Sequence, residues 1–148
     1  WLLLLCAVGL LVLVQLRIEA IFVALCSLAL VAAYPFMKRI TWWPQLWLGL
    51  VFSWGVPVGW VAVTGRADAA MLWLYGGTIF WVVGYDTIYA HQDAEDDALI
   101  GVKTTARLFG ARTHLALVIF YGLAVVLIGA ALALVAPVLA ALAAALGR

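Results

Sequence analysis

The sequence predicts an all-α, polytopic membrane protein, and three observations lead to that fold class. The 148 residues are 69% hydrophobic and only 10% charged, whereas an ordinary soluble domain has about 25% charged residues. The mean hydropathy is +1.21, which implies more apolar surface than a soluble domain of this size can bury. Long segments carry no charge, and only helices satisfy their backbone hydrogen bonds within such segments in a bilayer. We therefore expect a transmembrane helical bundle with the lipid bilayer as its solvent.

Five segments are candidates for membrane-spanning helices. Arg17 and Glu19 end the first segment, and Pro137 is expected to end the fifth. The third contains the stretch GVPVG, where Pro57 predicts a kink because its nitrogen cannot donate a helix hydrogen bond. By residue number, the expected spans are about 1–16, 20–37, 44–63, 69–90 and 115–136.

The five helices are expected to form a single transmembrane domain over residues 1–148 that is incomplete at both ends. The sequence opens inside an apolar run at Trp1, without the basic start that is typical of a signal peptide. The net charge is only +1, so composition gives no reason to expect a nucleic-acid partner.

Charge is concentrated at one end of the expected bundle. Eight of the fifteen charged residues lie between Asp86 and Arg112. With five spans, the loops at 38–42 and 88–112 fall on the same side. That side carries more Lys and Arg than the other, so the positive-inside rule places it in the cytoplasm, or in the matrix of a mitochondrion. Charge gathered in this way indicates a functional site.

Three aspartates follow the fourth apolar segment at a helical spacing. Asp86, Asp93 and Asp97 are seven and four residues apart, so a continuous helix would place them on one face, together with Tyr89. Alternatively, the helix frays after Ala90, which leaves Asp86 at the membrane boundary and Asp93 at the start of a loop. An unpaired carboxylate at that boundary is costly and is usually functional.

Clustered carboxylates repel one another, so the arrangement favours a bound cation. Mg²⁺ is typically held by a few carboxylates together with phosphate oxygens. The basic side chains Lys103 and Arg107 follow in the sequence, and basic groups beside a carboxylate-bound metal are suited to a diphosphate. Positive-inside anchoring explains these two residues equally well. Glu95 and Asp96 are interpreted as part of a solvated loop.

Two segments resemble the UbiA-type intramembrane aromatic prenyltransferases. The stretch YDTIYAHQDAEDDALIGVKTTARLFG, from Tyr85 to Gly110, resembles their second aspartate-rich motif and the loop after it. The stretch AYPFMKRITWWPQLWLGLVFSWGVP, from Ala33 to Pro57, resembles the segment between two of their helices. YPFMKR and YDT-x-YA in one chain are similar to the 4-hydroxybenzoate polyprenyltransferase branch, of bacterial or mitochondrial type.

The resemblance implies nine helices around a cavity, in which two aspartate-rich motifs face each other through Mg²⁺ and a diphosphate. It implies the transfer of a polyprenyl group from polyprenyl diphosphate to the ring of 4-hydroxybenzoate, in ubiquinone biosynthesis. The expected site residues are Asp86, Asp93 and Lys103 as catalytic groups, Asp86, Asp93 and Asp97 as Mg²⁺ ligands, and Tyr89, Lys38, Arg39 and Arg107 as substrate-binding groups. For Lys38 and Arg39, topology anchoring is the alternative.

The family's first aspartate-rich motif, of the NDxxDxxxD kind, is absent from residues 1–148. We therefore expect the chain to be an internal fragment that is inactive by itself. The expected location is the bacterial plasma membrane or the mitochondrial inner membrane. Two alternatives stay open: a segment of an ion- or proton-coupled transporter, and a UbiA-type enzyme with a different aromatic or lipid acceptor.

Overall fold

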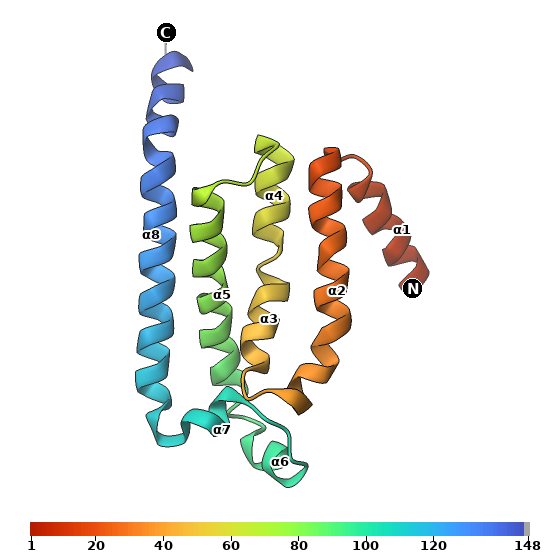
Figure 1. Ribbon diagram of the computed structural model, residues 1–148, viewed down its shortest axis with the longest axis vertical. Coiled ribbons are helices and arrows are strands. Elements are labelled where there is room, and N and C mark those ends of the chain that lie inside the picture. The colour runs from red at the N-terminus through yellow and green to blue at the C-terminus, as the bar shows by residue number, and fades with distance from the viewer. Residues whose placement is uncertain (147–148) are drawn as a thin grey trace.

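The computed structural model describes residues 1–146, which form helices and connections without any strand. The long helices stand side by side in one layer, in the order α8, α5, α3 with α4, α2 and α1 (Figure 1). The predicted all-helical membrane bundle is confirmed. The helices are α1 (Leu2–Leu13), α2 (Ile18–Ile40), α3 (Pro44–Phe52), α4 (Gly55–Thr64), α5 (Ala69–Tyr89), α6 (Ala94–Leu99), α7 (Thr105–Phe109) and α8 (Thr113–Leu146), with a 3₁₀ turn at Gly110–Arg112.

Three segments of the described chain are long and apolar enough to cross a bilayer: Ile18–Ile40, Pro44–Thr64 and Thr105–Pro137. The first predicted span, 1–16, was too long. Helix α1 ends at Leu13, three residues before the predicted end. The predicted fourth span, 69–90, corresponds to α5, which has 21 residues and lies between two of the three apolar segments (Figure 1).

Helix α5 is the most thoroughly covered helix of the layer because it packs on α8 on one side and on α3 and α4 on the other. These two flanks meet protein rather than lipid, so they tolerate Gly and Thr at positions where a lipid-facing surface favours Leu or Val. Its buried residues are Ala70, Met71, Gly77, Ile79, Val82, Val83, Gly84 and Thr87.

The predicted third span is one helical segment with a break. Helix α3 ends at Phe52 and α4 begins at Gly55. Pro57 explains the position of the break, because it has no N–H to donate to the carbonyl four residues earlier, at Ser53. The Ser53 carbonyl instead accepts from the Val56 N–H, at 2.9 Å. The kink predicted at GVPVG thus lies just before that stretch. At Pro137 the prediction was wrong, since α8 continues through this residue to Leu146.

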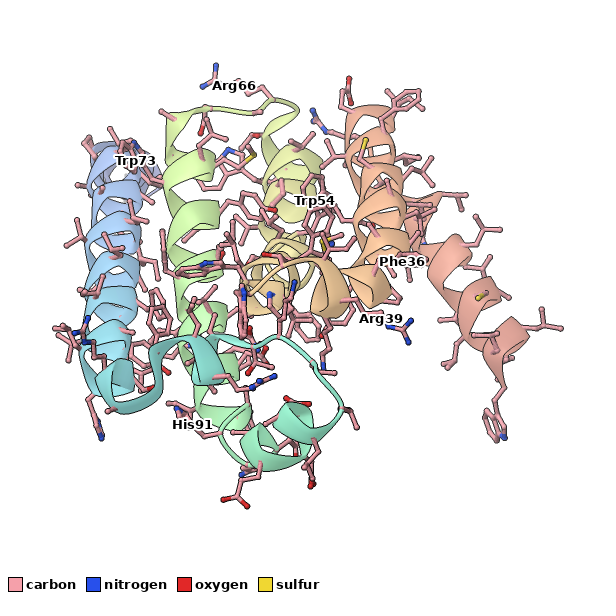
Figure 2. All side chains as sticks on the ribbon, turned by 60° about the horizontal axis from the view of Figure 1, so that its bottom comes forward. Phe36, Arg39, Trp54, Arg66, Trp73 and His91 are labelled. Carbon is pink, nitrogen blue, oxygen red and sulfur yellow. The ribbon has the colours of Figure 1, made fainter. Side chains whose placement is uncertain are left out.

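Two tryptophans attach the broken helix to α2. The indole nitrogen of Trp47 donates to the Leu30 carbonyl, and that of Trp54 donates to the Val23 carbonyl, both at 2.8 Å. The side chain of Trp54 lies among the helices of the layer (Figure 2). These bonds give each indole N–H a partner away from water, as such a group requires, and they fix α3 and α4 against α2.

The two polar regions of the sequence meet at one end of the layer, which we call the polar end. It consists of the connection between α2 and α3 and of residues 90–112, which contain α6 and α7 (Figure 1). The Lys103 N–H donates to the Lys38 carbonyl at 3.2 Å, which joins the two regions directly. Phe109 packs edge-on against Trp43, with ring centroids 5.5 Å apart. The prediction that both loops share one end is confirmed.

Candidate active site

A pocket of about 150 Å³ opens at the polar end, with room for about five water molecules. The last turns of α2 and α5, the first turn of α3 and the segment after α5 all contribute to it. It is lined by Tyr34, Lys38, Pro44, Gln45, Asp86, Tyr89, Ala90, Gln92, Asp93, Asp97 and Thr104. Residues from both polar regions that meet at the polar end thus contribute to a single cavity.

The three predicted aspartates reach this pocket from two helices rather than one. Helix α5 ends at Tyr89, and a turn leads to Asp93, which occupies the N-cap position of α6 without a side-chain hydrogen bond to it. The continuous helix from Asp86 to Asp97 was therefore wrong, and the alternative, in which the helix ends near Ala90, is confirmed. Asp86 and Asp97 are partly buried, and Asp93 is exposed.

Of the remaining predicted residues, Lys38 and Tyr89 also line the pocket. Glu95 and Asp96 are exposed and do not line it, in agreement with their interpretation as solvated loop residues. The structure therefore separates the five carboxylates of this stretch into three that face the cavity and two that face water.

The three pocket aspartates fit a metal ion that takes some of its ligands from a bound phosphate. Among residues 1–146, no group of three or more His, Cys, Asp or Glu side chains could hold a metal ion together, so Asp86, Asp93 and Asp97 share a pocket without forming a closed ligand cluster. Mg²⁺ commonly uses one or two carboxylates, with substrate phosphates and water as its other ligands. The donors present fit that mode of binding.

Four basic residues were predicted to belong to the site, and only one of them lines the pocket. Lys38 faces the cavity. Arg39 is exposed, and its side chain extends away from the helices (Figure 2). The Lys103 ammonium lies 3.4 Å from the Ile40 carbonyl and 6.0 Å from the centre of the Trp42 ring. The structure thus does not bring Arg39 or Lys103 to the pocket wall.

Arg107 holds the acidic segment in place from behind the pocket. Its guanidinium donates to the carbonyl of Asp97, at 3.2 Å, and to the carbonyl of Val102. The same group lies over the ring of Trp42, 5.6 Å from its centre, within the range of a cation–π interaction. Arg107 therefore links α7 to α6 and to the connection that precedes α3.

Arg107→Ala is expected to loosen the acidic segment. Loss of two hydrogen bonds from a charged donor removes enough free energy to raise local opening about tenfold. Amide hydrogen exchange across residues 94–102, followed by mass spectrometry, should accelerate by that factor in the absence of any substrate. Arg112→Ala is the control, because the exposed Arg112 makes no side-chain hydrogen bond to the described residues. Unchanged exchange in Arg107→Ala would show that the segment does not depend on this side chain.

Sequence reasoning missed six pocket residues, of which four are polar: Tyr34, Gln45, Gln92 and Thr104. Gln45 offered a usable signal, because it is the single strongly polar residue in the otherwise apolar segment 44–63. Thr104 offered a weaker one, since Thr at this position also fits a helix N-cap, and its hydroxyl does accept from the Arg107 N–H at 3.3 Å. Nothing in the pattern distinguished Tyr34 from an interfacial aromatic residue.

The fold and the pocket together define a helical membrane protein with a carboxylate-lined cavity at one end of its bundle. The profile of the UbiA prenyltransferase family matches residues 1–147. The chain belongs to this family. The transporter segment that the sequence left open is therefore set aside in favour of the enzyme family.

Curated relatives support the same assignment. A mitochondrial 4-hydroxybenzoate polyprenyltransferase of Drosophila melanogaster is 53% identical over 110 residues, which are 74% of this chain and 28% of the relative. The protein of the same name from Rattus norvegicus is 50% identical over 138 residues, or 90% of this chain and 37% of the relative. That from Homo sapiens is 56% identical over 88 residues, or 59% of this chain and 24% of the relative.

The chain thus spans between 24% and 37% of the length of these relatives. No solved structure matches it.

Proposed function

We propose that the complete protein containing this chain transfers a polyprenyl group from polyprenyl diphosphate to the aromatic ring of 4-hydroxybenzoate. Membership of the UbiA family and the names of relatives at 50% to 56% identity support the reaction class and the acceptor. The observation that carries the proposal is the pocket in which Asp86, Asp93 and Asp97 lie together with Lys38. Carboxylates beside a cation are the groups needed to hold a metal diphosphate.

In this proposal the carboxylates of Asp86 and Asp93 bind Mg²⁺, and Asp97 binds it or orients its water. The metal would supply positive charge that neutralises the departing diphosphate. Lys38 donates to an anionic oxygen of the substrate from the opposite wall of the pocket. Tyr89, at the end of α5 and 62% exposed, borders the entrance and contacts substrate there.

The reaction breaks the allylic C–O bond, and its electron pair leaves with the diphosphate. The ring carbon ortho to the acceptor's hydroxyl then attacks the allylic carbon, a C–C bond forms, and the ring carbon loses a proton. The allylic cation must be shielded from water. The half-buried position of Asp86, near the end of a helix packed among apolar neighbours, supports a diphosphate bound at the boundary between water and such a shielded region.

Arg107 acts as a positioning residue in this scheme, because its guanidinium is bonded to backbone carbonyls of the acidic segment. A catalytic role for Lys103 and substrate contacts for Arg39 and Arg107 stay predictions from the family resemblance. The protein would lie in the bacterial plasma membrane or the mitochondrial inner membrane, with the polar end on the cytoplasmic or matrix side.

Membranes that contain the complete protein test the proposal. Radiolabelled polyprenyl diphosphate and 4-hydroxybenzoate should yield a prenylated acid, and chelation of divalent cations should abolish the product until Mg²⁺ is restored. Benzoate lacks the activating hydroxyl and is the control acceptor, with no product expected. Absence of product from 4-hydroxybenzoate, in membranes where the protein is shown to be folded, would refute the proposed reaction.

A further inference from the structure

Gln45 is a buried amide whose orientation is fixed by its neighbour. It is the second residue of α3 and only 3% exposed. Its Oε1 atom accepts from the Thr105 N–H at 3.0 Å. A backbone N–H can only donate, so the oxygen of the amide must face Thr105, and the –NH₂ group must face the other way. The two orientations of this amide are therefore distinguishable.

A chain of hydroxyl groups holds Thr105 in place behind Gln45. Thr87 donates its hydroxyl proton to the Val83 carbonyl at 2.6 Å, so this hydroxyl has no proton left to donate. The Thr105 hydroxyl, 2.7 Å away, must therefore be the donor to Thr87. Both threonines have 0% exposed area. Each polar group in this chain has its partner, and the amide of Gln45 is held against a rigid support.

The –NH₂ group of Gln45 is the one part of this network without a partner. Nε2 makes no hydrogen bond to any residue that the structure describes, and it is not among the side-chain atoms sealed away from solvent without a bond, which are Ser53 Oγ and Trp60 Nε1. Gln45 lines the pocket that also contains Asp86 and Lys38. Its two N–H donors are thus accessible from the cavity and are free to bind water or a ligand there.

We propose that Gln45 contacts substrate directly and donates from Nε2 to an anionic oxygen in the pocket. This inference rests on the proposed transferase function. The oxygen belongs either to the diphosphate or to the carboxylate of the aromatic acceptor. A neutral amide can donate to an anion here without adding a second positive charge beside Asp86, where Lys38 already lines the pocket.

The substitution Gln45→Glu isolates the donor. The glutamate keeps an oxygen for the Thr105 N–H and nearly the same shape, but it replaces –NH₂ with an oxygen that repels an anion. In the complete protein, KM is measured for each substrate with the other saturating. We expect the KM of the substrate that supplies the oxygen to rise about 10- to 100-fold. The KM of the other substrate should change less than twofold.

The affinity for inorganic diphosphate, measured by calorimetry in the presence of Mg²⁺, tells whether the oxygen belongs to the diphosphate or to the acceptor's carboxylate. Weaker diphosphate binding by Gln45→Glu, with a raised KM for polyprenyl diphosphate, assigns the contact to the diphosphate. Unchanged diphosphate binding, with a raised KM for 4-hydroxybenzoate, assigns it to the carboxylate. If the wild type binds diphosphate but transfers no prenyl group, the proposed function fails, and weaker binding by the variant still supports Gln45 as an anion contact.

Wild-type KM values and wild-type diphosphate affinity in the variant would overturn the inference. Should Gln45→Glu fail to fold, Gln45→Met replaces it, since methionine is neutral, of similar length and free of N–H donors, and the same shifts are expected. Thr87→Val serves as the comparison for indirect effects, because it breaks the supporting chain without changing the pocket wall. If KM and diphosphate affinity change as much in Thr87→Val as in the Gln45 variant, the effect comes from loosened packing and not from a lost substrate contact.

Discussion

Asp86→Asn in the complete protein is expected to lower the rate of prenyl transfer by about 10³-fold, near the upper end of what loss of one preorganised electrostatic contact costs. Asp86 is the one carboxylate of the pocket that is supplied by a long helix of the layer, so its position is fixed by the packing of α5 rather than by a loop. The asparagine keeps the size of the side chain and removes the charge that would bind Mg²⁺. Single-turnover product formation at saturating substrate is the measurement.

Asp96→Asn is the matched control for this experiment. Asp96 lies in the same acidic stretch and carries the same charge, but it is exposed and does not line the pocket. Its variant should transfer at the wild-type rate, within a factor of two. If Asp86→Asn retains near-normal turnover, or if both variants fall equally, the rate does not depend on a carboxylate at this position of the pocket, and the metal assignment is wrong.

The part of the site that could be predicted from sequence is the part that depends on charge. An ionised side chain at the end of an apolar segment is costly, so Asp86 was visible without any structure, and so was the gathering of two polar loops at one end. Sequence could not tell that Arg107 turns toward backbone carbonyls while Lys38 faces the cavity. Both are basic residues at a membrane boundary, and only the packing of the segment around Trp42 separates them.

The uncharged pocket residue Gln45 was missed for a related reason. Gln45 carries no charge, so a scan for ionisable groups passes over it. Its significance comes from a bond to Thr105, which is sixty residues away in the sequence. Sequence spacing predicts contacts within one helix, but it holds no information about which residue of a distant loop meets the first turn of α3.

Hydropathy predicted α5 almost to the residue, at 69–90 against Ala69–Tyr89, and its largest errors lie at the ends of α1 and α8. The predicted span 44–63 coincides closely with Pro44–Thr64. Helix α5 lies between neighbours on both sides, and its glycines, tyrosines and Asp86 reflect close packing and the pocket rather than contact with lipid. Pro137 did not end α8 as predicted, because a proline removes one hydrogen bond but does not prevent a long apolar helix from continuing past it in a membrane.

The contact between α5 and α8 should fail when a single methyl group is added at Gly77. A Cβ atom there would lie 2.6 Å from Ile128 Cγ1, 3.0 Å from Ile128 N and 3.1 Å from the Ala124 carbonyl oxygen. Two of these atoms belong to the backbone of α8, so rotation of a side chain cannot relieve the overlap and the helices must separate. Gly77→Ala is therefore expected to lower the free energy of unfolding by about 1–3 kcal/mol, the usual cost of overpacking a well-packed contact.

Gly76→Ala makes the same chemical change one position earlier on the same helix. Its Cβ would meet only Leu127 Cδ1, at 3.5 Å, an ordinary contact with the movable end of a side chain. Alanine is also the better helix former by roughly 0.5–1 kcal/mol, so this variant should unfold at the wild-type midpoint or slightly above it. Thermal unfolding of both variants in the same detergent gives the comparison. Equal midpoints would mean that α5 and α8 are not held at the distance that only a glycine permits, and that α5, which carries Asp86, is less firmly supported by α8.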